Sequence, residues 1–141
     1  MDELSTGRLG IWSYLVPYIA ERPWFGWGGE GFQAVWTGFP IRQAHNGLMQ
    51  LLIEWGCVGA TLYAVMIGWL LLKGWGLYLA SVKKDGAATE LTYGIALTTA
   101  LLVLSVIDGV FYYGMTMSFL VTGFACVGKA LAGRRPGIAA G

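Results

Sequence analysis

The sequence is poor in charged residues. Only 12% of its 141 residues are charged, and the formal net charge is +1, whereas a soluble domain carries about 25% charged residues. Its apolar richness argues against a disordered polymer, and without a basic excess it is not predicted to bind nucleic acid. A soluble fold of this size would also have difficulty hiding an apolar fraction of 56%. We therefore predict an all-α integral membrane protein.

Residues that commonly bind metals are also scarce. The chain has two cysteines, Cys57 and Cys126, and one histidine, His45. The cysteines are far apart in apolar stretches and form no Cys-x-x-Cys pair, so we predict no metal site and expect both to pack as small apolar side chains. Residues 1–7 lack the basic and apolar regions of a signal peptide. A later helix is then expected to direct insertion, unless the sequence is part of a longer protein.

Glycines are abundant in the first third of the chain. Residues 26–31 match the dinucleotide-binding pattern Gly-x-Gly-x-x-Gly, but no buried strand precedes them and no βαβ unit follows. We interpret these glycines as a tight turn with positive φ angles and not as a nucleotide site.

Three apolar segments follow residue 46. We predict transmembrane helices at about 47–72, 91–107 and 110–132. The first would be about 39 Å long as a helix, which is enough to cross about 30 Å of hydrocarbon with some tilt. Residues 46–133 are therefore expected to form the membrane domain.

The basic residues predict the orientation. Lysines and arginines lie between the first two segments and around the tail at residues 134–141, but none lies near Asp108. By the positive-inside rule, the loop at 73–90 and the tail are cytoplasmic. Residues 1–45 and the Asp108-Gly109 turn are then expected on the opposite side.

Residues 1–45 are rich in tryptophan and contain one helical pattern, between Arg8 and Arg22. Ser5 or Thr6 is expected to cap this helix, and Pro17 to kink or end it. The apolar residues expected on one side of it are Leu9, Trp12, Leu15, Val16 and Ile19. Two interpretations stay open, an amphipathic helix lying in the membrane interface or a helix packed on protein outside this sequence.

The densest polar cluster begins with Arg42 and His45 and continues into the first apolar segment. Asn46, Gln50 and Glu54 repeat every four residues and share one helix face. Glu54 would lie about 12 Å inside the helix, a depth at which ionisable groups usually face a bundle interior or a watery cavity. One alternative is that Asn46 caps the helix and the stripe is accidental. The functional interpretation is favoured because the only histidine stands at the helix entrance, where anions bind.

Three sequence blocks resemble the O-antigen ligase superfamily. They are Ser-Thr-Gly-Arg-Leu-Gly-Ile-Trp at 5–12, Glu-Arg-Pro-Trp-Phe-Gly-Trp-Gly at 21–28 followed by Gly31-Phe32, and the His-Asn, Gln and Glu-x-Gly pattern at 45–56 with Gly59. The superfamily includes O-antigen ligases, O-antigen polymerases and protein O-oligosaccharyltransferases. The blocks cover about residues 5–59, and the later apolar segments fit the C-terminal helices of the family.

The resemblance implies a polytopic glycosyltransferase of the GT-C type in the bacterial inner membrane. Such enzymes transfer a glycan from undecaprenyl diphosphate to a hydroxyl of an acceptor glycan or of the lipid A core, at the periplasmic face and without a metal or other cofactor. Residues 1–45 would then be a periplasmic loop. Family members have many more spanning helices, so the chain is expected to be a C-terminal portion. Its expected partners are membrane lipids and the N-terminal helices of the same enzyme.

The resemblance also implies roles for individual residues. It places the functional arginine of the outer loop at Arg8 and the functional histidine at His45. A second functional arginine is placed at Arg42, less strictly because the spacing before the histidine varies. Arginine stabilises a departing diphosphate through two-point hydrogen bonding. The histidine accepts the acceptor's proton or binds phosphate as a cation. Arg22 and the polar face formed by Asn46, Gln50 and Glu54 are expected to bind the substrate or to orient His45.

Other functions stay open at this point. An O-antigen polymerase would differ mainly in its acceptor. A truncated membrane protein would serve as a non-catalytic assembly partner, and a transporter piece would use Glu54 and Asp108 as ion ligands. Asp108 is interpreted mainly as part of an Asp-Gly turn, with a functional role on the same side of the membrane as His45 as the second possibility.

Overall fold

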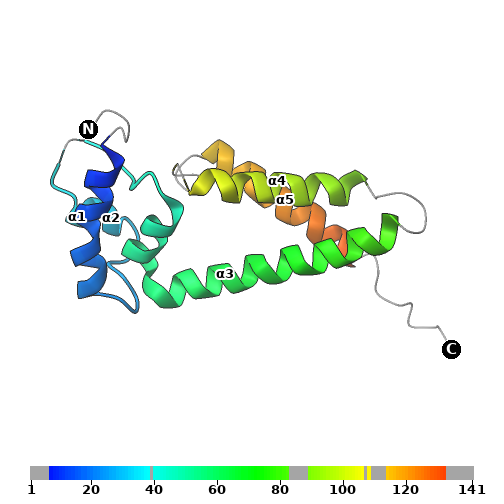
Figure 1. Ribbon diagram of the computed structural model, residues 1–141, viewed down its shortest axis with the longest axis horizontal. Coiled ribbons are helices and arrows are strands. Elements are labelled where there is room, and N and C mark those ends of the chain that lie inside the picture. Colours follow the sequence, from blue (N-terminus) through cyan, green and yellow to red (C-terminus); the bar gives the residue numbers. More distant parts are fainter. Residues whose placement is uncertain (1–6, 39, 83–88, 107, 109–113, 133–141) are drawn as a thin grey trace.

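The computed structural model describes residues 7–38, 40–82, 89–106, 108 and 114–132. All regular secondary structure in these residues is helical. The helices are α1 (Arg8–Glu21), α2 (Gly31–Val35), α3 (Gly47–Val82), α4 (Thr89–Ser105) and α5 (Gly114–Ala132). In Figure 1, α1 and α2 lie against the beginning of α3, and the rest of α3 extends away from them beside α4 and α5. The predicted all-helical class is confirmed.

Helix α3 is longer than the segment from which we predicted it. We expected the helix to end at Leu72, but it continues through Lys73 to Val82, because the residues after Lys73 are again apolar and contain no proline. Gly47–Ser81 and Met115–Ala132 are long and apolar enough to cross a membrane, and α4 is a shorter apolar helix. A third crossing stays a prediction, and the region expected to connect α4 with α5 lies mostly outside the described residues.

Small residues bring α4 and α5 close together. A Cβ atom added to Gly94 would lie 2.8 Å from the Cβ of Cys126, and one added to Gly123 would lie 2.6 Å from the hydroxyl oxygen of Thr98. Close approach at such residues is a common way in which membrane helices associate. Cys126 packs here as predicted, whereas Cys57 is exposed on α3.

Helix α1 tolerates its internal proline. Pro17 lies inside the helix, which continues to Glu21, so of the two effects expected of Pro17, a kink or an end, the end does not occur. Gly7, with φ of 74°, occupies the N-cap position, without a side-chain hydrogen bond. The expected caps, Ser5 and Thr6, lie outside the described residues.

The buried face of α1 differs from the predicted one. Ile11 and Leu15 are buried, whereas Leu9 and Val16, which we expected on the apolar side, are exposed. The buried pair packs into a cluster that includes Phe32 of α2 and residues Val35, Ala44 and Ile53. α1 therefore packs on this chain itself, and contact between its outer face and a membrane stays a prediction.

Gly56 interrupts α3, with φ of 64° and ψ of −169°. In a continuous helix, the amides of Cys57 and Val58 would bond to the carbonyls of Ile53 and Glu54. Here all four groups bond instead to a turn formed by residues 23–28, which we call the docking turn. Ile53 O accepts from Trp27 N (2.8 Å), Glu54 O accepts from Gly28 N (2.9 Å), Cys57 N donates to Pro23 O (2.7 Å) and Val58 N donates to Trp24 O (3.1 Å). The docking turn thus gives each of the four groups a new partner, as buried backbone groups require.

The docking turn fits the break because glycines face it. Gly26 has φ of +66°, and a Cβ atom there would lie 2.6 Å from the carbonyl carbon of Glu54. A Cβ atom on Gly56 would collide with the backbone of Trp24. The positive φ angles predicted for this glycine-rich turn are present at Gly26 and Gly28. These glycines allow the backbone of the docking turn to approach the backbone of α3 closely.

Candidate active site

His45 stands in the turn just before α3 and contacts a residue 63 positions later in the chain. Its Nδ1 atom lies 3.1 Å from Oδ1 of Asp108, which follows the end of α4. Both side chains are partly exposed, at 27% for His45 and 41% for Asp108. His45 has φ of +50°, a left-handed conformation that residues other than glycine adopt mainly where their surroundings enforce it. The pair is therefore held in place by the fold and remains partly exposed at the surface of the chain.

The contact with Asp108 favours one form of the imidazole. A carboxylate accepts hydrogen bonds, so Nδ1 carries the hydrogen that faces Asp108 in the neutral ring. Nε2 is then the ring atom with an available lone pair. This arrangement suits a histidine that accepts a proton from a bound hydroxyl group.

Asn46 connects the beginning of α3 to the end of α4. Its Oδ1 accepts the N–H of Met49 at 3.0 Å, which is an N-cap of α3, and its Nδ2 donates to the carbonyl of Val106 at 2.9 Å. The capping role weighed as an alternative is therefore what the structure shows for Asn46. Because Val106 lies two residues before Asp108, the same side chain also helps to set the separation between His45 and Asp108.

Gln50 and Glu54 form a buried polar pair behind His45. Gln50 is 3% exposed and Glu54 is 8% exposed. Gln50 Oε1 accepts the N–H of Ala44 at 2.9 Å, and Gln50 Nε2 donates to Glu54 Oε1 at 2.6 Å. The predicted common face of these residues is present. Both also line a cavity of about 520 Å³, together with Trp55, Tyr63 and Met117 among others.

The structure separates the predicted arginines. Arg8 begins α1 and shares a face with Trp12 one turn later, whose indole Nε1 donates to the carbonyl of Ala44 at 2.9 Å. The start of α1, the start of α3 and the end of α4 gather at one end of the helices (Figure 1). Arg42 is exposed in the segment leading to His45. Arg22 is at the opposite end of α1, with its guanidinium 4.1 Å from the ring centre of Trp27.

Tyr14 and Tyr18 connect α1 to the residues around the end of α2. The Tyr14 hydroxyl donates to the carbonyl of Val35 at 2.9 Å and lies 3.2 Å from the hydroxyls of Tyr18 and Thr37. The hydrogen bond with Thr37 lowers the pKa of Tyr14, whereas the hydrogen bond with Tyr14 raises the pKa of Tyr18. These bonds attach α1 to the end of α2 and the segment after it.

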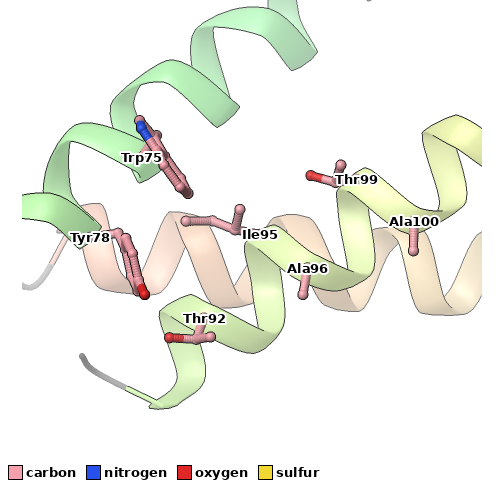
Figure 2. Close-up of a pocket in the computed structure, with 7 residues that line it drawn as sticks. All are labelled: Trp75, Tyr78, Thr92, Ile95, Ala96, Thr99 and Ala100. Carbon is pink, nitrogen blue, oxygen red and sulfur yellow. The ribbon is translucent and has the colours of Figure 1, made fainter. Parts of the chain in front are cut away.

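A second cavity lies far from His45. It has a volume of about 450 Å³ and is formed by the last third of α3 and by α4. Figure 2 shows the stacked rings of Trp75 and Tyr78 on α3 facing Ile95 on α4. None of the predicted site residues lines this cavity. Within the described residues, no cluster of three histidine, cysteine or acidic side chains is arranged to hold a metal ion.

Two contributors to the site were missed or undervalued in the sequence. Asp108 was interpreted mainly as a turn residue, although it is the only acidic residue between the second and third apolar segments and was expected on the same side as His45. Trp12 was interpreted as an apolar or interfacial residue, and no sequence signal indicated its bond to Ala44. Both contacts join segments that are distant in sequence.

The family comparison agrees with the resemblance seen in the sequence. The model of the O-Antigen ligase family matches residues 2–64, which include α1, α2, the docking turn, His45 and the first part of α3. No curated protein and no solved structure matches the chain.

Proposed function

We propose, from the match of residues 2–64 to the O-Antigen ligase family model, that the chain is the acceptor-activating part of a membrane glycosyltransferase. The reaction is transfer of a glycan from undecaprenyl diphosphate to an acceptor hydroxyl, on a lipid A core or another glycan, at the periplasmic face of the inner membrane. The observation that carries the proposal is the pairing of the only histidine with Asp108 at 3.1 Å. The two apolar helices α3 and α5 are consistent with a membrane location.

In the proposed mechanism His45 is the base. Its Nε2 takes the proton of the acceptor hydroxyl while the oxygen attacks the anomeric carbon of the glycan. The bond between that carbon and the diphosphate oxygen breaks, and the electron pair leaves with undecaprenyl diphosphate. Asp108 holds the imidazole in the tautomer that can accept the proton. The proton then passes from the imidazole to solvent.

Arg8 and Arg42 are proposed to stabilise the leaving diphosphate. The growing negative charge needs positive donors in a site with little water, and guanidinium groups bind phosphate oxygens at two points without a metal. The bond from Trp12 to Ala44 supports this role for Arg8, since it brings the start of α1 beside His45. Further helices of the enzyme, together with membrane lipid, are proposed to complete the groove for the lipid chain.

The other predicted substrate-binding residues have weaker support. Arg22 stacks on Trp27 at the far end of α1, so its contact with the glycan stays a prediction. The amide of Asn46 is engaged in capping α3 and in bonding to Val106. An O-antigen polymerase of the same superfamily would use the same groups with a different acceptor, whereas a non-catalytic assembly partner would not need them.

The test is glycan transfer in membranes that contain the chain together with the N-terminal helices of an enzyme of this family, at equal protein levels. His45→Ala should lower the rate by about 10²–10⁴-fold, the usual scale of a lost general base. Arg8→Lys keeps the charge but loses the two-point fork, so the rate should fall while part of the donor binding survives. Lys73→Ala, which removes an exposed cation far from the site, is the control.

The outcomes separate the alternatives. If His45→Ala transfers as fast as the parent while Arg8→Lys is inactive, His45 is not the base and arginine electrostatics carry the reaction. If both variants are fully active, the site assignment is wrong, and the non-catalytic alternative gains support.

A further inference from the structure

We infer that Gln50 and Glu54 are positioning residues for His45 and not ligands of the substrate. Gln50 fixes the backbone just before His45, and Glu54 fixes the orientation of the Gln50 amide. The kinetic part of this inference rests on the proposed function, because it concerns the residue that accepts the proton there.

The first step is the environment of Ala44. This residue is fully buried, and both of its backbone polar groups are bonded to side chains. Its N–H donates to Gln50 Oε1 at 2.9 Å, and its carbonyl accepts from Trp12 Nε1 at 2.9 Å. The peptide units before and after Ala44 are therefore each held by one of these hydrogen bonds. The next rotatable bond is the N–Cα bond of His45, and its φ of +50° directs the His45 side chain toward Asp108.

The second step is the choice of rotamer at Gln50. A glutamine amide can be turned over, which exchanges its donor and its acceptor. Glu54 Oε1, at 2.6 Å, is an acceptor for Nε2 and therefore places Oε1 toward the N–H of Ala44. A turned amide would aim two donors at each other and would leave a buried carboxylate facing an oxygen. The backbone of Glu54 is itself held, since its main-chain carbonyl accepts from the N–H of Gly28 in the docking turn.

The third step concerns how far the Gln50 amide is already engaged within the protein. The side-chain atoms Oε1 and Nε2 of Gln50 both form hydrogen bonds within the protein, and Gln50 is 3% exposed. A substrate group that took over either of these two bonds would release Ala44 or free the Gln50 amide to turn. The observed contacts therefore connect the docking turn through Glu54 and Gln50 to the backbone of the turn that carries His45.

The first measurement does not depend on catalysis. His45 is the only histidine of the chain, so its reaction with diethyl pyrocarbonate can be followed by mass spectrometry on the 141-residue protein in detergent. Gln50→Leu removes the acceptor of the Ala44 N–H at similar volume, so the turn relaxes and the labelling rate should rise severalfold. Gln33→Leu, at an exposed glutamine of α2, is the matched control and should keep the parental rate.

The second measurement is kinetic, in the transfer assay described above. Gln50→Leu should lower kcat by about 10²-fold, the scale of a catalytic group displaced by about 1 Å, with little change in KM. Gln50→Glu should lower kcat as well, because two carboxylates then face each other. In the double variant Gln50→Glu/Glu54→Gln, a carboxylate oxygen at position 50 still accepts the N–H of Ala44, and the bond between positions 50 and 54 is rebuilt with donor and acceptor exchanged. The double variant should therefore regain most of the kcat that Gln50→Glu loses.

The results that overturn the inference differ from those that overturn the function. A raised KM with an unchanged kcat in Gln50→Leu would make Gln50 a substrate ligand. A double variant no better than Gln50→Glu would refute the pairing, and this comparison decides even where Gln50→Leu folds poorly. If labelling changes as expected but the parent transfers no glycan, the positioning of His45 stands and the proposed function fails.

Discussion

Replacing Gly26 by alanine is expected to detach the docking turn from the break in α3. The left-handed backbone at this position, with φ of +66°, costs an alanine about 1 kcal/mol. The new methyl group would also lie 2.6 Å from the carbonyl carbon of Glu54 and 2.7 Å from the carbonyl oxygen of Ile53. These backbone atoms cannot move away without loosening the bonds from Trp27 and Gly28, each of which contributes about 1 kcal/mol. We expect a total loss of about 3 kcal/mol in local stability.

Two neighbouring glycines provide a graded control. Gly28 has φ of +88°, but a Cβ atom there would meet nothing within 4 Å, so Gly28→Ala should cost only the conformational strain of about 1 kcal/mol. Gly29 has neither a positive φ nor a close neighbour, so Gly29→Ala should cost nothing or stabilise slightly by restricting the unfolded chain. The order of the three variants therefore separates the clash from the backbone strain.

Hydrogen exchange measures this directly, because the amides that bridge the docking turn and α3 are protected only while the two remain bonded. Peptides covering residues 22–31 and 53–58 should exchange about 10²-fold faster in Gly26→Ala, about fivefold faster in Gly28→Ala and at the parental rate in Gly29→Ala. Equal protection in Gly26→Ala and Gly28→Ala would show that the close contact with Glu54 does not hold the turn, and the reasoning would fail.

Three further predictions concern the site, the first helix and the orientation. Asp108→Asn should lower glycan transfer by at least about tenfold, since an amide can offer a donor to the imidazole and permit the wrong tautomer; parental kcat in this variant would contradict the tautomer argument. Pro17→Ala should raise the free energy of unfolding by about 2 kcal/mol, the balance between about 3 kcal/mol for an interior proline and up to about 1 kcal/mol of chain entropy; a lower melting temperature in detergent would count against it. In a variant without the native cysteines, an impermeant thiol reagent on intact cells should label Gln33→Cys but not Thr89→Cys, and the reverse pattern would invert the proposed orientation.

The sequence by itself determined the local features. Long apolar runs with little charge specify helices whatever their neighbours, so the class and the approximate places of α3, α4 and α5 were predictable. The four-residue spacing of Asn46, Gln50 and Glu54 predicted their common face, because residues four apart lie on one side of an α-helix. Hydrophobic periodicity did not predict which apolar residues of α1 are buried, because their burial depends on the segments that pack against the helix. Leu9 and Val16 are as apolar as Ile11 and Leu15, but only the latter pair meets Phe32 and Ile53.

Only the tertiary structure decided the break at Gly56 and the pairing of His45 with Asp108. A glycine within an apolar run does not predict an interruption, because the lost helical bonds must first find substitutes. Those substitutes lie in the docking turn, about thirty residues earlier in the chain. The separation between His45 and Asp108 likewise depends on how α3 packs beside α4 and on the bond from Asn46 to Val106. Such distances depend on the packing of segments far apart in sequence, which a pattern of neighbouring residues does not contain.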